Sequence, residues 1–360
     1  MEERKHEKTR FVVLSANPVV GKEMHQLDPN DSSMMHGLKS AFEKALNEHN
    51  GSLREHIDIA FTDLSSVGDD KRIRVREGYR LNAKKNQESE KWEATWEKHS
   101  GEEIVPTTIL TRVPSKQYDE LVREIAEHVP ILNPPEFSAV SMDKEKSYEL
   151  MKKFGIKTPD SRFVYNPKEA AKALDELPEG QVFVKPIFGG GAIGDPQPYP
   201  KDKLQGLVDS GELEFGSGLV FQEYLGKEAE ADTKRVFAFT RKDPETGKMI
   251  ASVVGAVGRK GVPGKVLGAL SAGAESYKVP PLDYHSLREI SNKTAVALAE
   301  EIGKPPQMIG LDVAKKDGEY YMLEINNFAG GLYGIEEVDP HAFTILGQAL
   351  ISSALDADKN

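Results

Sequence analysis

Two stretches near the C-terminus, IGLDV at residues 309–313 and LEINN at residues 323–327, are separated by a short polar turn and predict one β-hairpin. Glu324 and Asn326 are two residues apart, so they share one face of a strand. Together with Asp312 they offer carboxylate and amide oxygens, which suit Mg²⁺ because this ion combines a few protein ligands with water and phosphate oxygens. The hairpin is therefore a candidate magnesium–nucleotide site. The alternative is a surface hairpin that carries scattered acids.

The turn decides on which face Asp312 lies, because a shift of one residue in the pairing moves a side chain to the opposite face. A two-residue turn at residues 317–318 would direct Asp312 away from Glu324. A three-residue turn at residues 316–318 would direct both carboxylates the same way. We expect the three-residue turn, since it is the common type I turn with a G1 bulge and Gly318 is the residue that it requires.

Composition limits the class of protein. A chain of 360 residues exceeds the size at which one hydrophobic core usually stops growing, so two or three subdomains are expected. The formal charge of −11 argues against a general binder of nucleic acid or of membrane surfaces. The absence of cysteine excludes disulfides, thiolate metal sites and cysteine nucleophiles. The charged N-terminus and the short apolar run at residues 11–14 do not form a signal peptide. We expect a soluble, cytoplasmic protein.

Periodicity predicts a mixed α/β chain. Asn166, Pro167 and Glu169 form a typical helix start, with an N-cap, a proline at the first helical position and an acid at the third. An Asn-Pro-Pro break at residues 133–135 marks a domain boundary. The other expected helices cover 33–49, 115–128, 141–154 and 283–302, and a last one opens at 339–340. The expected strands are 10–17, 56–64, 107–112, 182–187, 218–225, 234–242 and 249–260.

Residues 66–106 read as a long polar insertion between these elements, which is usually functional or disordered. Its first part, residues 71–85, holds seven Lys or Arg against one acid, Glu77. One interpretation is a lid or cleft wall that presents basic side chains to an anionic substrate. The alternative is a solvated, variable insertion. The arginines concerned are Arg72, Arg74, Arg76 and Arg80.

Lys185 ends the predicted strand VFVKP and precedes a loop with four glycines within residues 189–194. Glycines let backbone N–H groups approach phosphate oxygens closely. The order of lysine and glycines fits neither a P-loop nor a dinucleotide-binding turn, so the loop is a candidate flap over phosphates or a simple turn. Arg235, Arg241 and Arg259 lie on later strands, where a buried guanidinium needs an anionic partner and a surface position does not.

The order of the motifs resembles the ATP-grasp superfamily, and within it the branch of glutathione synthetase and the ribosomal-protein glutamate ligases. The resemblance covers residues 106–355. The matching stretches are TILTR, ILNPPEFSAVSMDKEKSYELMKKFGIKTPDSRFV, VFVKPIFGGGAIG, VFQEYL, ADTKRVFAF, GLDVAKKDGEYYMLEINN and FAGGLYGIEE. Residues 1–135, which end at the Asn-Pro-Pro break, are expected from their strand and helix pattern to form an N-terminal α/β domain that carries the polar insertion. By the resemblance, residues 136–226, with the glycine-rich flap at 188–194, and residues 227–360, with the metal site, form two α+β subdomains that grip ATP.

The resemblance also implies roles for single residues. Lys144 and Lys185 would contact ATP phosphates under the flap, Gln222 to Leu225 would meet adenine, and Asp232 would lie at the ribose. Relatives show Asp-x-Arg before the phosphate-facing arginine, whereas here Asp232 stands three residues before Arg235, which puts its role in doubt. The implied nucleotide-binding positions are Lys144, Lys185, Gly189, Gly190, Gly191, Gln222, Glu223, Tyr224, Leu225 and Asp232.

Asp312, Glu324 and Asn326 would hold two Mg²⁺ ions, with Mn²⁺ as an alternative, and Glu324 would bridge them. Arg235 would face the γ-phosphate, and Arg259 is our candidate for stabilising an oxyanion. The loop with Asn327, Gly330 and Gly331 would lie against the carboxylate substrate.

The chemistry that the resemblance implies is activation of a carboxylate by ATP to an acyl phosphate, which an amine attacks to form an amide. Phosphoryl transfer depends mainly on positioning and on neutralising charge, which fits magnesium, lysine and arginine. The expected partners are small-molecule or peptide carboxylates and amines, with no nucleic acid and no membrane. Relatives often form homodimers. Two alternatives are a small-molecule kinase of the same superfamily and a non-catalytic nucleotide sensor.

Overall fold

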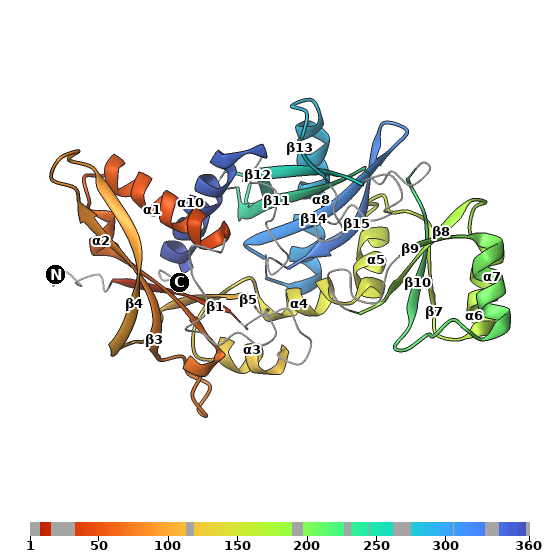
Figure 1. Cartoon of the computed structure of the whole chain (residues 1–360), viewed down its shortest axis with the longest axis horizontal. Coiled ribbons are helices and arrows are strands. Elements are labelled where there is room, and N and C mark those ends of the chain that lie inside the picture. The colour runs from red at the N-terminus through yellow and green to blue at the C-terminus, as the bar shows by residue number, and fades with distance from the viewer. Residues whose placement is uncertain are drawn as a thin grey trace. The chain divides into compact units, whose positions relative to one another are not determined.

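The structure is a computed structural model that describes residues 8–15, 33–112, 119–188, 197–226, 232–243, 245–261, 275–304, 306–327 and 338–357 (Figure 1). The chain divides into two compact units. One comprises residues 1–135 together with 331–360, and the other comprises residues 136–330. Within the described ranges, no helix has both the length and the apolar composition needed to cross a membrane.

The first unit is built on a six-stranded sheet with the order β4-β3-β2-β1-β5-β6. The four strands β2, β1, β5 and β6 are parallel, and the chain within β1 from Phe11 to Leu14 is fully buried. Continuous apolar runs are typical of parallel strands covered on both faces. The bounds are β1 (Thr9–Ser15), β2 (Ile57–Asp63), β3 (Val75–Lys85), β4 (Trp92–Ile104), β5 (Thr108–Arg112), β6 (Ile131–Leu132), α1 (Ser33–Glu48), α2 (Leu53–His56), η3 (Leu64–Ser66) and α3 (Asp119–Ala126).

The polar insertion at 66–106 is a regular part of this sheet, which corrects the expectation of an irregular segment. β3 and β4 form a long antiparallel hairpin, and β3 pairs with β2. Two of its arginines have these carboxylate partners: Arg76 Nε lies 3.0 Å from Glu103 Oε2, and Arg80 Nη2 lies 3.0 Å from Asp58 Oδ1. Charged residues on the exposed positions of both strands made the sequence resemble a loop.

The last helix, α10 (Pro340–Ala357), packs against α1 in this same unit. A Cβ added to Gly347 of α10 would lie 2.4 Å from the carbonyl oxygen of Gly37 and 2.6 Å from Cβ of Ala41, both on α1. The two helices therefore approach backbone to backbone. Because α10 buries its apolar face on α1, residues 331–360 group with the N-terminal unit. Our expected domain 227–360 had grouped them with the strands that precede them.

The second unit contains two antiparallel sheets, ordered β7-β10-β8-β9 and β13-β12-β11-β14-β15. Helices α6 and α7 share a core with the four-stranded sheet, and α5 and α8 share one with the five-stranded sheet (Figure 1). Asn166 caps α6 as predicted, since its side chain accepts a hydrogen bond from the Glu169 N–H. The bounds are α4 (Pro135–Ser141), α5 (Lys144–Lys153), β7 (Ser161–Val164), α6 (Pro167–Glu176), β8 (Gln181–Pro186), β9 (Gln197–Pro200), α7 (Lys201–Ser210), β10 (Leu219–Glu223), β11 (Asp232–Lys242), β12 (Met249–Lys260), β13 (Glu275–Lys278), α8 (Asp283–Ile302), β14 (Met308–Lys316) and β15 (Glu319–Asn326).

Candidate nucleotide and metal site

The turn of the β14–β15 hairpin differs from the prediction. Lys316 pairs with Glu319, so the turn has two residues, and Asp317 and Gly318 have φ values of 51° and 84°. Two positive φ angles are the mark of a type I′ turn, the favoured two-residue hairpin turn. The expected three-residue turn is therefore wrong.

A β-bulge further along the hairpin restores the expected geometry. The register shifts between Asp312 and Val313, so that Val313 pairs with Met322 whereas Asp312 pairs with Glu324. Leu323 is the extra residue. A bulge changes which side chains face one another, because it puts two residues of one strand opposite one of the other. Asp312 and Glu324 thus lie directly opposite each other on one face, which confirms that part of the prediction.

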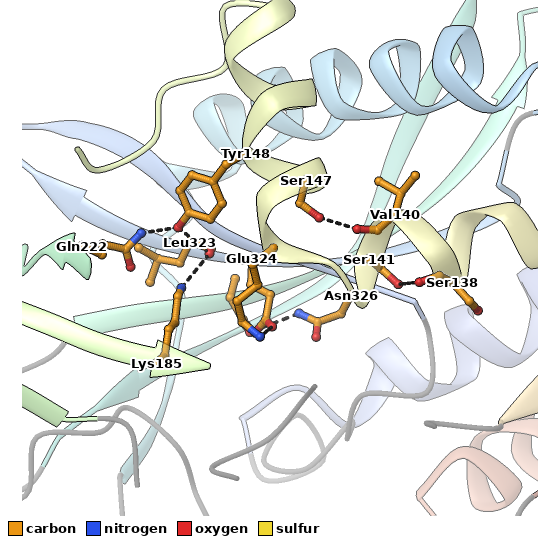
Figure 2. A network of polar contacts seen from close by, with 12 residues as sticks. Ser138, Val140, Ser141, Ser147, Tyr148, Lys185, Gln222, Leu323, Glu324 and Asn326 are labelled. Carbon is orange, nitrogen blue, oxygen red and sulfur yellow. Dashed lines mark hydrogen bonds and ion pairs between the residues drawn. The ribbon is translucent and has the colours of Figure 1, made fainter. Parts of the chain in front are cut away.

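Asn326 joins the two carboxylates on this face. It lies two residues after Glu324 on β15, and its Nδ2 donates to Asp312 Oδ2 at 3.2 Å (Figure 2). The site thus offers two carboxylates and an amide. In the described part of the chain no group of three or more His, Cys, Asp and Glu residues is placed to hold a metal. A set of hard oxygen donors with only two charges fits Mg²⁺, which relies on substrate phosphates for the rest of its shell.

Lys144 faces this cluster from the first residue of α5. The helix predicted for residues 141–154 begins only at Lys144. Asp143 adopts an extended conformation, and its side chain caps α5 by accepting a hydrogen bond from the Lys146 N–H. Lys144 is only 6% exposed, and its Nζ lies 3.5 Å from Glu324 Oε1. Its backbone N–H donates to the carbonyl of Ile187 at 3.2 Å, just before the glycine-rich loop. The helix start therefore fixes a buried cation beside a predicted metal ligand.

Lys185 approaches the same hairpin from β8. Its Nζ donates to the carbonyl oxygen of Leu323, the bulge residue, at 3.4 Å (Figure 2). Burial lowers the pKa of Lys185, although the charges of Glu324 and Asp312 oppose this shift. Burial likewise lowers the pKa of Lys144, with Glu324 opposing. An anionic ligand would favour the charged form of both lysines.

Arg259 adds a buried cation, and Arg235, whose side chain is 11% exposed, adds a largely buried one. Arg235 donates to both carboxylate oxygens of Asp312 in a bidentate ion pair. Although burial has the opposite effect, this pair holds the pKa of Asp312 below its usual value and raises that of Arg235. Arg259 is 8% exposed, and burial followed by the charge of Arg235 lowers its pKa to about 10. Arg241, by contrast, is exposed, so it is the surface arginine of the three.

The predicted adenine segment begins at the end of β10. Gln222 is buried, and its Nε2 donates to the hydroxyls of Tyr148 and Ser161, so its side chain has protein partners. The backbone N–H groups of Glu223 and Tyr224 are also committed, to the carbonyls of Asp160 and Gln181.

The side chains of Glu223 and Tyr224 contact residues of the strands β14 and β8. The Glu223 carboxylate pairs with Lys316. The Tyr224 ring stacks on Phe183, with centroids 6.3 Å apart and an interplanar angle of 20°. Leu225 is half-buried beyond this pair. Phe183 lies two residues before Lys185, so both side chains share one face of β8, and an aromatic pair thus accompanies this lysine.

Asp232 does not belong to this site. Its carboxylate accepts hydrogen bonds from Lys234 Nζ at 2.9 and 3.0 Å and from the Tyr277 hydroxyl. Alternation along β11 places Asp232 and Lys234 on the face opposite to Arg235. Thr233 is the residue that shares the face of Arg235 two positions before it. The predicted ribose contact by Asp232 is therefore wrong, because the strand register turns that side chain away.

The remaining predicted residues divide between described and undescribed parts of the chain. Asn327 follows the β14–β15 hairpin, and its Nδ2 donates to Ser138 Oγ of α4. Gly189, Gly190 and Gly191 of the flap, and Gly330 and Gly331 of the substrate loop, lie outside the described residues. Sequence reasoning missed Tyr148, which contacts both Gln222 and the Leu323 carbonyl. Its spacing of four residues from Lys144 was the available signal, because such pairs share a helix face.

Comparisons with known proteins show which family the chain resembles. The model of the RimK-like ATP-grasp domain matches residues 141–339. The probable alpha-L-glutamate ligase of Aliivibrio salmonicida (strain LFI1238) is 28% identical over 196 residues, which are 54% of this chain and 58% of that protein. The chain thus spans little more than half the length of this relative.

Two solved structures share the fold across almost the whole chain. D-alanyl-alanine synthetase A from Vibrio cholerae O1 biovar eltor str. N16961 aligns with a TM-score of 0.55 and 14% identity, covering 97% of this chain and 99% of that one. The ATP-grasp ligase PsnB, complexed with minimal precursor, Mg, and ADP, aligns with a TM-score of 0.54 and 15% identity, covering 97% and 98%. Because the family model matches more than half of its length, the chain belongs to the RimK-like ATP-grasp family.

Proposed function

We propose that this protein is an ATP-dependent carboxylate–amine ligase that forms an amide bond and releases ADP and phosphate. The observation that carries the proposal is the bulged hairpin, which sets Asp312 opposite Glu324 with Asn326 on the same face. These three residues would hold the Mg²⁺ ions, two by analogy with the family. The ions would supply charge neutralisation between the protein and the ATP phosphates.

The charge balance around the hairpin supports a polyphosphate ligand. Four cations, of which Lys144 and Arg259 are buried and Lys185 and Arg235 are partly buried, lie around the two carboxylates of the hairpin, and burial lowers the pKa of both lysines. A buried excess of positive charge is costly unless an anion compensates it. ATP supplies that anion, and its phosphates would favour the charged forms of the lysines. The cations are Lys144, Lys185, Arg235 and Arg259.

Arg235 would change partners during the reaction. Both oxygens of Asp312 accept hydrogen bonds from its guanidinium, and Oδ2 also accepts from Asn326, so a metal ion at Asp312 would compete with the arginine for the carboxylate. The displaced guanidinium would then be free to face the phosphoryl group that is being transferred. A positioned arginine that stabilises transferred charge is typical of phosphoryl-transfer sites.

The proposed chemistry has two steps. A carboxylate oxygen of the substrate attacks the γ-phosphorus of ATP, which gives an acyl phosphate and ADP. The amine of the second substrate attacks the acyl carbon, the tetrahedral oxyanion collapses, and inorganic phosphate leaves as the amide forms. Arg259, which is buried and lies near Arg235, would stabilise that oxyanion, a role in which one donor typically contributes about 10²–10³-fold in kcat.

The substrate class rests on what the relatives are named for, an alpha-L-glutamate ligase and a D-alanyl-alanine synthetase. We propose an amino acid or peptide carboxylate as one substrate and an amino-acid amine as the other. The β3–β4 hairpin is not part of this proposal, because its residues Arg76 and Arg80 have carboxylate partners of their own.

The test is ADP release by the purified protein with Mg²⁺ and ATP against a matrix of carboxylates and amines. Hydroxylamine in place of the amine should give ADP together with a hydroxamate, because it traps an acyl phosphate. The control is Glu324→Ala, which should be inactive. ADP release that needs only a hydroxyl compound, without hydroxamate, would identify a kinase and overturn the proposal.

A further inference from the structure

Tyr148 joins three elements of the nucleotide site. It lies four residues after Lys144 on α5 and is 6% exposed. Its hydroxyl donates to the carbonyl oxygen of Leu323 at 3.0 Å and accepts from Nε2 of Gln222 (Figure 2). One phenol group thus connects the helix that carries Lys144, the strand that leads to the adenine segment, and the bulge of the metal hairpin.

Tyr148 also restricts where the ammonium group of Lys185 can lie. The ammonium group of Lys185 lies 5.6 Å from the centroid of the Tyr148 ring, within the range of a cation–π contact. It also donates to the carbonyl oxygen of Leu323, to which the Tyr148 hydroxyl donates. The ring thus contacts Lys185 Nζ itself, and the hydroxyl contacts the oxygen to which Nζ donates.

Packing alone does not require a tyrosine here. The ring meets Phe163 edge to face, with centroids 5.9 Å apart, and belongs to the core between the five-stranded sheet and its helices. Phenylalanine or leucine could fill that space. What a tyrosine adds is a hydroxyl at the meeting point of Gln222, Leu323 and Lys185, where a buried polar group needs partners and finds them.

We propose that Tyr148 is a positioning residue that holds Lys185 ready for the nucleotide phosphates. A lysine side chain loses considerable rotamer freedom when it is fixed, and a contact that fixes it beforehand reduces this cost on binding. By donating to the Leu323 carbonyl, the hydroxyl fixes the oxygen that accepts from the Lys185 ammonium group. The inference rests on the proposed nucleotide site, because it assigns Lys185 to the phosphates.

The experiment is a calorimetric titration of the full chain with the non-hydrolysable analogue AMPPNP and Mg²⁺. Loss of the ring contact in Tyr148→Leu should weaken binding about tenfold. Loss of the hydroxyl alone in Tyr148→Phe should weaken it about threefold. The matched control is Tyr320→Phe, which removes a buried hydroxyl from β15 on the opposite face of the sheet and should leave the affinity unchanged.

A double-mutant cycle separates positioning from packing. In a Lys185→Met background, either change at Tyr148 should cause no further loss of affinity, since the residue acts through Lys185. An equal loss in both backgrounds would overturn the inference. If Tyr148→Leu does not fold, as thermal unfolding will show, the Tyr148→Phe cycle decides alone. Failure of the wild-type protein to bind AMPPNP would instead overturn the nucleotide site itself, before any variant is considered.

Discussion

Lys234 and Arg235 are neighbouring cations on β11, of which Lys234 is buried and Arg235 largely so, but they face opposite sides of the sheet. Lys234 donates to Asp232, two residues away on its own strand, and faces the rings of Tyr277 and Tyr320 at 5.6 and 5.7 Å. Arg235 pairs with Asp312, which belongs to the bulged hairpin.

The two cations differ in what their partners can do. Asp232 has no role beyond its contacts with Lys234 and Tyr277 in our account, so that cluster serves the fold. Asp312 is a predicted metal ligand, so its pairing with Arg235 can be exchanged for a metal ion. Burial of a charge therefore does not identify a functional residue by itself. The identity of the partner carboxylate is what separates the two faces.

The largest effect is expected at the hairpin on the Arg235 face. Glu324→Gln keeps the shape of the side chain but removes the charge that faces Asp312 and Lys144. We expect a loss of ADP-forming turnover of about 10³-fold, in the range found when a group that stabilises transition-state charge is removed. Steady-state assay of ADP release checks this. Turnover within tenfold of the wild type would separate Glu324 from the chemistry.

The next largest effect should come from Lys185→Met. The substitution keeps an apolar stem of similar length and removes the ammonium group near the Leu323 carbonyl. Loss of a charge-assisted contact with phosphate should weaken ATP binding about tenfold to a hundredfold. Equilibrium dialysis with labelled ATP measures the change, with Lys315→Met on the α8 face as the control. Unchanged affinity for ATP would contradict the assignment of Lys185 to the phosphates.

On the opposite face, Lys234→Met should affect stability and not binding. The change removes two hydrogen bonds to Asp232, whose half-exposed side chain can regain water. We expect the free energy of unfolding to fall by about 1–2 kcal/mol, while the affinity for ATP stays within about twofold. Urea unfolding and ATP binding are measured on the same preparation. A large loss of affinity with little loss of stability would erase the distinction between the two faces.

The smallest effect is expected at the hairpin of the first unit. Arg76 is largely exposed and pairs with Glu103. Its reversal in Arg76→Glu should change KM for the identified substrates by less than about twofold, because exposed ion pairs contribute little and we place no substrate there. Arg76→Gln serves as the control for charge. A rise in KM with Arg76→Glu that Arg76→Gln does not share would restore the interpretation of this region as a wall for an anionic substrate.

Much of the element order could be predicted from the sequence, since α8 and β12 match their expected ranges and Asn166 caps α6 as expected. Periodic apolar residues and local caps determine such elements without help from distant contacts. The β3–β4 hairpin within residues 66–106 was not predicted, because charged residues occupy its exposed positions.

The β14–β15 hairpin depends on contacts that its own sequence does not reveal. Gly318 suits either turn, so the turn type could not be settled from its residues. The bulge at Leu323 is supported by Tyr148 and Lys185, which lie 175 and 138 residues away in the chain. No pattern within the hairpin reveals such partners. Asp232 was placed wrongly for a related reason, since a shift of one position along β11 decides which face a side chain occupies.

The central claim is that the bulged hairpin binds a divalent metal through Asp312, Glu324 and Asn326. Titration of the protein with Mn²⁺ in the presence of AMPPNP, followed by electron paramagnetic resonance, tests it directly. We expect the wild type and Lys234→Met to bind Mn²⁺ alike, and Glu324→Gln to lose most of this binding. Equal Mn²⁺ binding by the wild type and Glu324→Gln would show that the hairpin is not the metal site.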